Sequence, residues 1–340
     1  MWEQIRSNVA RSIVIIILMG ALLLAIGYFI GFYLIGSALA GLVIALIIWI
    51  IMSLIGYFQG GSILLGVSGA RKIRKKDNPQ LYDVVEEMKI ASGLPAMPDI
   101  YIINDQALNA FSTGRDPAHA SVAITSGLLQ KLNRDELEGV MGHEMGHVKN
   151  RDILLMSMAS VLLGSIVILA WLATRSFFFA GAPAQGRGRR GSNNGGSAVQ
   201  LLLLIVGLVL MILAPIFAQL MYFALSRRRE YLADASSALY TRYPEGLASA
   251  LEKLEVSPAP VKKANNATAP MYIVNPFRKN NQSREAASPM STHPPTSERI
   301  RILRAMAGVS YNDYEKAYES VKRGSIIPSS ALGNTTDSEH

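Results

Sequence analysis

The chain has 340 residues, 50% of them hydrophobic and 17% charged, with a formal net charge of +8. A mean hydropathy of +0.25 and this apolar content indicate a membrane protein. The chain has no cysteine, which excludes disulfides and cysteine-ligated metals, and we find no interleaved aromatic-basic motif that would suggest nucleic-acid binding. We therefore interpret the positive charge as the flanks of membrane segments and as attraction to anionic lipid.

The N-terminal region predicts a membrane hairpin. Residues 12–70 contain no Asp, Glu, Lys or Arg. One helix of that length would reach about 90 Å, against a hydrocarbon core of roughly 30 Å, so the stretch must fold back. We predict spans over Ile13–Phe32 and Leu39–Phe58, with a turn near Gly36. The first stretch is too long for a cleaved signal peptide.

Two further apolar runs, Ile153–Ala173 and Val199–Leu225, bring the prediction to up to four spans. Pro215 interrupts the second run, so a shallow re-entrant hairpin is the alternative for this pair. Lys and Arg beside short spans remain in the cytoplasm, and they flank the first, second and fourth runs here. The basic loop between the third and fourth runs is the one segment that opposes this orientation, in which the soluble parts face the cytoplasm.

The run His143-Glu-Met-Gly-His147 predicts a zinc site of a hydrolase. On a helix, positions i and i+4 share one face, so the two imidazoles can bind one tetrahedral ion. Glu144 then stands beside the metal, where a carboxylate can take a proton from the attacking water and pass it to the leaving amine. Asn133 and Glu136 form a capping box that starts such a helix.

A catalytic zinc needs a third protein ligand, and we predict Glu230. Positions 150 and 153 are Asn and Ile, which excludes the long metzincin pattern. An even number of crossings between the two segments brings them to the same membrane face, and Asp234 lies one turn beyond Glu230, placed to orient a zinc-bound histidine. The alternative is that Glu230 and Asp234 belong to a solvated charged helix beside Arg229.

The intervening residues predict a small α+β unit. Residues 79–91 read as a helix, and the short apolar runs 100–103, 107–111 and 121–124 read as strands. Such strands can present an open edge to which an extended substrate adds, which would place Asn109 and Phe111 along the cleft; a simple turn role for Asn109 is the alternative. Further along, residues 245–254 predict an amphipathic helix and 271–274 a strand.

Five segments together form a more specific pattern than H-E-x-x-H alone. They are the N-terminal hairpin, Asn109-Ala-Phe111, His143-Glu-Met-Gly-His147-Val-Lys-Asn-Arg-Asp152, Arg229-Glu-Tyr-Leu-Ala-Asp234 and Thr292-His-Pro-Pro-Thr-Ser-Glu-Arg299. This pattern resembles the HtpX family of membrane zinc endopeptidases. Two segments depart from it, a Gly/Arg-rich insert over 181–196 and a long polar stretch over 257–281.

The resemblance implies one Zn²⁺ per subunit held by His143, His147 and Glu230, with Glu144 as general base and Asp234 supporting a ligand. It implies a site facing the cytoplasm in a bacterial or archaeal membrane. The implied role is quality control under stress, cutting unfolded or misfolded membrane proteins alongside ATP-dependent membrane proteases. Candidate substrate-binding or transition-state residues are Asn109, Phe111, Arg229 and His293, the last as a donor to the oxyanion.

The predicted fold is mainly α and integral to the membrane. It has up to four transmembrane helices and a soluble α+β protease domain of the zincin, gluzincin-like type, with a short edge-strand sheet. The predicted divisions are a hairpin over 1–60, two protease segments over 71–152 and 226–325, a second hairpin over 153–225 with a loop at 175–198, a mobile loop at 257–270 and a disordered tail over 326–340.

Two other functions remain open from the sequence. The related CAAX prenyl endopeptidases share the zinc motifs but enclose their site among seven spans, more than this chain supplies. A non-catalytic membrane assembly factor with a structural zinc site is the alternative from another class. A closed structural site has four protein ligands, whereas three can be assembled here, and Glu144 would then have no use.

Overall fold

The computed structural model describes residues 2–32, 36–179, 212–218, 227–257, 259–264, 268–274, 276, 293–322, 324–327 and 331–332. The chain divides into two compact units. The first comprises residues 1–12, 57–157 and 223–340, and the second comprises 13–56 and 158–222. Boundaries fall inside α1 (Trp2–Ile30), α2 (Ala38–Ser68) and α6 (Asp152–Phe179), so each of these helices contributes to both units.

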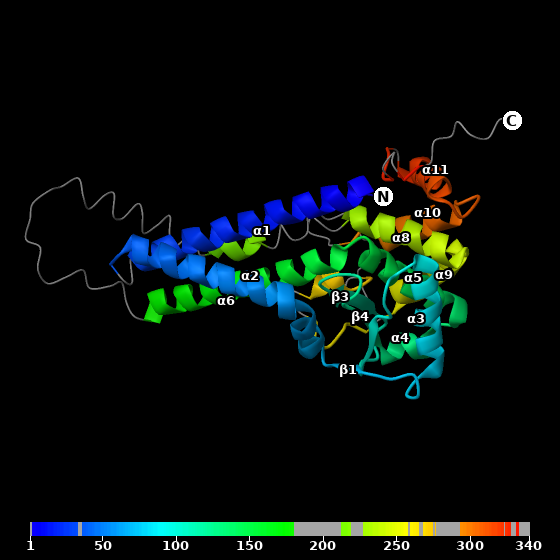
Figure 1. The fold of residues 1–340 in the computed structure, drawn as a ribbon, viewed down its shortest axis with the longest axis horizontal. Coiled ribbons are helices and arrows are strands. Elements are labelled where there is room, and N and C mark those ends of the chain that lie inside the picture. The colour runs from blue at the N-terminus through cyan, green and yellow to red at the C-terminus, as the bar shows by residue number, and fades with distance from the viewer. Residues whose placement is uncertain are drawn as a thin grey trace, which may run out of the picture. The chain divides into compact units, whose positions relative to one another are not determined.

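The first unit combines helices with a four-stranded sheet (Figure 1). Its helices are α3 (Pro79–Ser92), α4 (Ser126–Lys131), α5 (Arg134–Lys149), α8 (Arg227–Thr241), α9 (Pro244–Val256), α10 (Thr296–Arg304) and α11 (Tyr311–Lys322). Its strands are β1 (Ala70–Lys72), β2 (Asp99–Ile103), β3 (Ala110–Gly114) and β4 (Ala120–Thr125). The strands run in the order β1-β2-β4-β3, so β3 is an edge strand. β2 and β4 are parallel, and the other two pairs are antiparallel.

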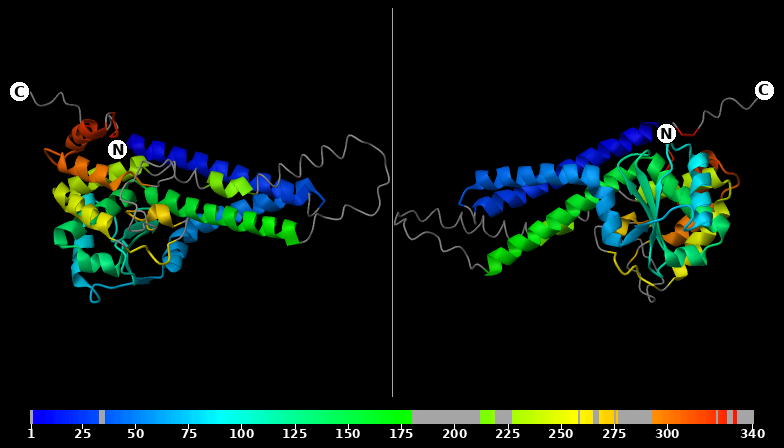
Figure 2. Two further views of the ribbon diagram at one scale, coloured as in Figure 1. Left: turned by 180° about the vertical axis from the view of Figure 1, so that it is seen from behind. Right: turned by 60° about the horizontal axis from the view of Figure 1, so that its bottom comes forward.

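Both faces of this sheet are covered (Figure 2, right). Side chains alternate across a strand, and in β4 Val122 and Ile124 join the core formed with α3 and α5, while Ala123 joins a second core. Leu64, from the last turns of α2, belongs to that second core with Phe111. The sheet is therefore held between the helical core and the end of α2.

Helix α5 starts where the sequence predicts. Asn133 accepts the N–H of Glu136, and the Glu136 carboxylate accepts the N–H of Asn133, each at 2.9 Å, which completes the predicted capping box. Further along, α5 packs closely on α8, because a Cβ at Gly146 would lie 3.0 Å from Cβ of Ser236. Ser237 donates to the carbonyl of Gly139 at 2.6 Å. These contacts bring α8 against the face of α5 that carries the histidines.

Helix α1 (Trp2–Ile30) and α2 approach closely in the second unit. A Cβ at Gly41 would lie 2.1 Å from the carbonyl oxygen of Gly27 and 2.6 Å from Cα of Gly31. Gly27 and Gly31 are four residues apart, the spacing at which small residues let two membrane helices meet backbone to backbone.

We expect Gly41→Ala to lower the thermal stability of the detergent-solubilised protein, because the new methyl group collides with backbone atoms that cannot yield. Gly66→Ala, in the same helix, is the matched control, since nothing lies within 4 Å of a Cβ built there. Alanine is the better helix former by about 1 kcal/mol, so this control should melt at the same or a higher temperature. Equal melting temperatures for the two variants would contradict the close helix contact.

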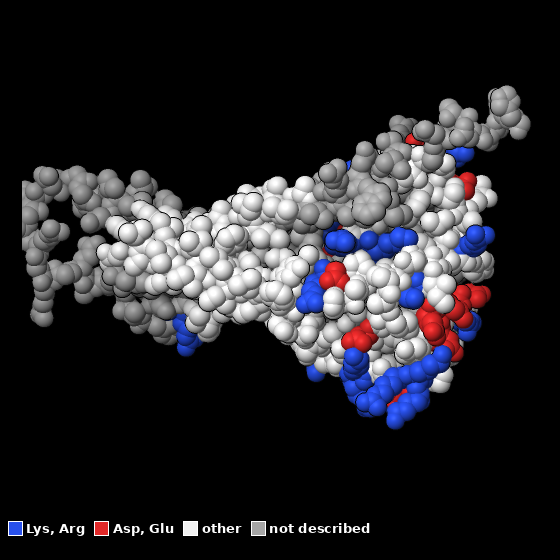
Figure 3. All heavy atoms as spheres, viewed as in Figure 1, with Lys and Arg blue, Asp and Glu red and all other residues white. Residues whose placement is uncertain are grey.

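Two described helices are long and apolar enough to cross a membrane, α2 and residues 152–172 of α6. Large apolar side chains of α2 such as Leu39, Ile47 and Leu54 are exposed, as lipid-facing residues are. Figure 3 shows that the visible surface over α1, α2 and α6 is largely uncharged. The described part of the fourth predicted run, residues 212–218, is helical, and its remainder lies outside the described residues.

Several predicted boundaries differ from the structure. The strand expected at 107–111 is β3 at Ala110–Gly114, and the strand expected at 271–274 is a 3₁₀ turn, η2 (Ala269–Met271), followed by irregular chain. α6 continues to Phe179, past the predicted start of the loop at 175, because apolar residues continue there. The insert at 181–196 lies outside the described residues, and so do residues 258, 265–267, 275 and 277–281 of the polar stretch predicted over 257–281.

The predicted disordered tail begins too early. Ile326 and Ile327 are buried, and both donate their backbone N–H groups to the Glu315 carboxylate. Ala331 and Leu332 also pack against the helical core. A buried acidic side chain that accepts backbone N–H groups holds this segment in place, and no local sequence pattern announces such a contact.

Candidate metal centre

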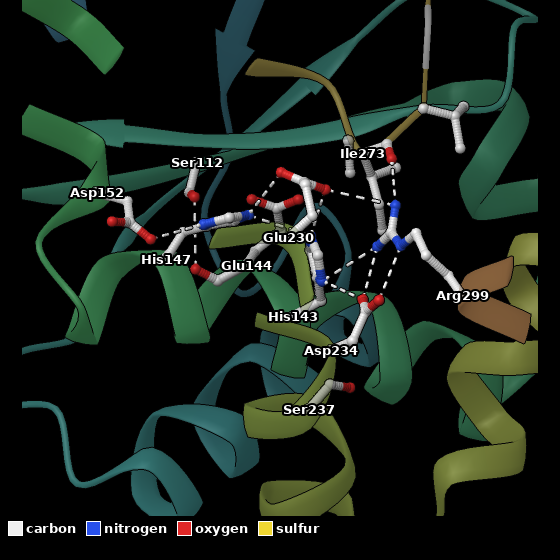
Figure 4. Close-up of polar contacts among 12 residues, drawn as sticks. Ser112, His143, Glu144, His147, Asp152, Glu230, Asp234, Ser237, Ile273 and Arg299 are labelled. Carbon is white, nitrogen blue, oxygen red and sulfur yellow. Dashed lines mark hydrogen bonds and ion pairs between the residues drawn. The ribbon is translucent and has the colours of Figure 1, made fainter. Parts of the chain in front are cut away.

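Three donor atoms from two helices converge in the first unit (Figure 4). The Nε2 atoms of His143 and His147 lie 3.2 Å apart. Glu230 places one carboxylate oxygen 3.6 Å from Nε2 of His143 and the other 3.4 Å from Nε2 of His147. Donors held about 2.0–2.1 Å from a tetrahedral zinc are about 3.4 Å from one another, so the spacing fits such an ion. The predicted ligand set is thus brought together.

Both imidazoles are oriented from behind by carboxylates. His143 donates its Nδ1–H to Asp234 at 2.9 Å, and His147 donates its Nδ1–H to Asp152 at 3.1 Å. This is the usual arrangement of metal-binding histidines, because the outer hydrogen bond fixes the tautomer and turns Nε2 toward the ion. Asp234 therefore lies where the sequence placed it. Asp152 was part of a recognised motif without an assigned role.

Arg299 contacts both Asp234, which orients a histidine, and the proposed ligand Glu230. Its side chain is fully buried and binds Asp234 through two hydrogen bonds, of 2.8 and 2.7 Å. It also lies 3.4 Å from a carboxylate oxygen of Glu230 and donates to the carbonyl of Ile273 at 2.9 Å. Burial alone would raise the pKa of Asp234, but the charge and hydrogen bonds of Arg299, together with those of His143, outweigh it and lower that pKa. Arg299 is the main contributor to the site that sequence reasoning did not single out.

Glu144 follows the first histidine and is 1% exposed. Among the described residues, no group forms a hydrogen bond with either oxygen of its carboxylate. A buried carboxylate without partners costs free energy, so its presence beside a cluster of metal-type donors is a feature to be explained. A metal ion with a reacting water molecule in the same space would supply the missing partners. The donor set and this carboxylate together fit a catalytic metal.

The other predicted site residues lie nearby with different contacts. Asn109 is buried, donates its side-chain amide to the Val274 carbonyl at 2.9 Å and accepts from the N–H of Ala110. Phe111 packs edge-on against Tyr272, with ring centroids 5.2 Å apart. Both residues thus position residues 272–274 across the edge of β3, and their predicted substrate-binding role stays a prediction.

Arg229 and His293 are buried close to the ligands. Nε of Arg229 lies 3.5 Å from Asp152. Burial lowers the pKa of His293, and its electrostatic neighbours are Glu230, Arg299 and His143. The structure therefore brings His293 to the site from a segment distant in sequence, and its role toward an oxyanion remains a prediction.

We expect metal binding at pH 7 to release at least one proton. In metal-free protein, burial lowers the pKa of His147, but hydrogen bonds to Asp152 and Glu230 outweigh it and raise the pKa to about 10. The ion must displace that proton, so the apparent affinity should rise with pH until His147 is neutral. Calorimetric titration in two buffers of different ionisation enthalpy measures the release, which Asp152→Asn should diminish. A binding heat that is independent of the buffer would contradict it.

The first unit is mostly helical with a small mixed sheet. Its site combines two histidines on one helix face with a glutamate from a second helix. These features are typical of a metallopeptidase. The model of peptidase family M48 matches residues 75–307, and the chain belongs to that family. It is similar to the protease HtpX homologue of Dictyoglomus turgidum, with 44% identity over 90% of this chain and 94% of the relative. It is also similar to that of Lactobacillus helveticus, with 41% identity over 90% and 100%.

Among solved structures, the chain is similar to the crystal structure of S. mikatae Ste24p, with 19% identity and a TM-score of 0.45, covering 89% of this chain and 67% of that one.

Proposed function

We propose that this metalloprotease is a membrane-bound zinc endopeptidase that hydrolyses peptide bonds of misfolded or damaged proteins at the cytoplasmic face. The observation that carries the proposal is the convergence of three donors, from His143, His147 and Glu230, at separations of 3.2 to 3.6 Å. Beside them lies the buried carboxylate of Glu144, which forms no hydrogen bond with any residue in the described part of the chain. Two histidines and one carboxylate are a common ligand set of catalytic zinc, which leaves a fourth position for water or substrate.

The proposed mechanism assigns one task to each side chain. Zinc, when bound, polarises the scissile carbonyl and makes the attacking water more acidic. The Glu144 carboxylate accepts a proton from that water and donates it to the leaving amine. Asp234 and Asp152 keep the two imidazoles in the tautomer that presents Nε2. His293 is the proposed donor to the developing oxyanion.

The membrane arrangement is the second part of the proposal. Four spans, formed by α1, α2, α6 and the run that ends near residue 225, would anchor a zincin-type protease domain. Exposed basic residues follow α2 directly, and Figure 3 shows a blue group at the lower edge of the view, near β1. The exposed basic residues that follow α2 are Arg71, Lys72, Arg74, Lys75 and Lys76. Such flanking charge favours the cytoplasmic side of a bacterial membrane.

An unfolded substrate class is supported by the edge strand β3. Adding an extended chain to an open strand edge uses main-chain hydrogen bonds, which do not depend on sequence, and needs a substrate segment free of other structure. Misfolded and damaged proteins supply such segments. The ATP-dependent membrane proteases implied as partners by the resemblance stay a prediction.

Proteolysis of an unfolded protein by the full chain, purified in detergent and stripped of metal, tests this function. We expect no cleavage without metal and cleavage after one equivalent of zinc is added. A zinc-loaded chain that leaves all unfolded substrates intact but cleaves a prenylated peptide would favour the CAAX-type activity instead. Zinc binding without any hydrolysis would favour the assembly factor with a structural metal.

A further inference from the structure

Beside the proposed metal ligands lies a partly open hollow. Its lining includes His147 and Glu230 of the proposed metal site and Ser112 of β3. The His147 side chain is 15% exposed, whereas that of His143 is completely buried. The site therefore opens on the His147 side, where the hollow lies.

The edge of β3 sets how a peptide can reach this hollow. Ile273 donates its N–H to the carbonyl of Ala110 at 3.0 Å, and the Ala110 N–H is bonded to the Asn109 side chain. These contacts occupy the free edge at Ala110. Backbone groups alternate along an antiparallel strand, so Ser112, two residues on, turns its N–H and C=O toward the same edge. An extended peptide pairing there would lie along the hollow and next to His147.

The hollow is lined by charged side chains that pair with one another and by apolar side chains. Asp152 accepts from His147 and lies 3.5 Å from Nε of Arg229, so these charged members neutralise one another. The remaining lining side chains are Ile153, Met156 and Met271. A charged substrate side chain would lose its hydration there without gaining a partner from these three residues. Two methionines, flexible and polarisable, can adapt to several apolar shapes.

We propose that this hollow is the specificity subsite for a residue that flanks the cleaved bond, and that it selects large apolar side chains such as Met, Leu and Phe. The inference rests on the proposed peptidase function and deepens it. Met271 and Met156 determine the preference, while the main-chain edge at Ser112 accepts any sequence. Apolar residues at this position should raise kcat/KM by roughly 10²-fold over Asp or Lys.

Cleavage-site mapping by mass spectrometry, on a degenerate mixture of unstructured peptides, tests the assignment with zinc-loaded protein in detergent. We expect the wild type to cut beside Met, Leu or Phe at one flanking position. Met271→Glu should reduce cutting at those sites at least tenfold and admit Lys or Arg at the same position. Met271→Ala, which enlarges the hollow and introduces no charge, should shift the preference toward Phe and Trp. Ile90→Glu, the same kind of change on an exposed part of α3, is the control and should match the wild type.

The outcomes separate the two proposals. If the wild type cuts peptides and both Met271 variants keep its preferences at both flanking positions, the subsite assignment is wrong while the peptidase function stands. If the zinc-loaded wild type cuts no peptide and no unfolded protein, the proposed function itself fails. Zinc content and melting temperature of each variant show whether a loss of cutting reflects misfolding. If Met271→Glu misfolds, the cleavage preference of Met271→Ala tests the subsite assignment.

Discussion

Glu144→Gln is expected to lower the rate of peptide hydrolysis by roughly 10²–10⁴-fold while the chain keeps its metal. The amide has nearly the same shape as the carboxylate but cannot accept the proton of the attacking water. None of the three donor atoms belongs to Glu144, so the ligand set remains intact. Hydrolysis of an unfolded protein and zinc content, measured on the same preparations, give both quantities.

Glu138→Gln is the matched control, because Glu138 lies on the same helix and pairs with Arg134 at 2.8 Å near the surface. It should hydrolyse the substrate at the wild-type rate. Glu144→Gln with wild-type activity would show that another group accepts the proton. Loss of zinc from Glu144→Gln would instead assign this residue to the ligand set, against the geometry.

Arg299→Ala is expected to cause the largest loss of stability, about 3–5 kcal/mol, because it leaves buried charge unpaired. Asp234, fully buried, would lose two charge-assisted hydrogen bonds, and Glu230 would lose a nearby cation. Since Asp234 orients His143, the variant should also bind zinc more weakly. Thermal denaturation and zinc titration of the detergent-solubilised protein measure both effects.

Arg304→Ala provides the comparison, one turn further along α10. Arg304 pairs with Glu245 and Glu252 on the surface, where ion pairs contribute little. Its melting temperature should stay close to that of the wild type. If Arg299→Ala had the same melting temperature as Arg304→Ala and kept the wild-type affinity for zinc, the claim that Arg299 stabilises Asp234 and Glu230 would be wrong.

The proposed ligand set could be predicted from sequence because helical spacing pairs residues on each of two helices and because a catalytic zinc needs a third protein ligand. His143 and His147 are one helical turn apart, and Glu230 and Asp234 repeat that spacing on a second helix. The start of α5 was equally accessible, since a capping box is a local signature. What periodicity could not provide is the packing of α8 on α5, which follows from small residues at their contact.

Asp152 and Arg299 escaped assignment for physical reasons. Asp152 is five residues after His147, off its helical face, and reaches it because Arg151 adopts a left-handed backbone with φ of 58° between α5 and α6. Arg299 is 65 residues beyond Asp234, so their pairing is purely tertiary. The one sequence signal for either residue was its place at the end of a recognised motif.

The segment around Met271 shows the opposite error. Its apolar residues read as a strand, yet Asn109 supplies side-chain hydrogen bonds to Val274 where a strand would use its backbone. Apolar alternation reports burial, and Tyr272 and Ile273 are indeed buried, but it does not distinguish a paired strand from an irregular segment held by one backbone bond to β3 and by side chains.

Zinc content of metal-stripped and reloaded protein, compared between the wild type and Glu230→Gln, tests the central claim most directly. Glu230 is the one proposed ligand on a separate helix, so it tests the fold and the site together. We predict one tightly bound zinc per wild-type chain and a large loss of affinity in Glu230→Gln, with Glu252→Gln on the surface unaffected. One zinc bound to Glu230→Gln with wild-type affinity would contradict the account.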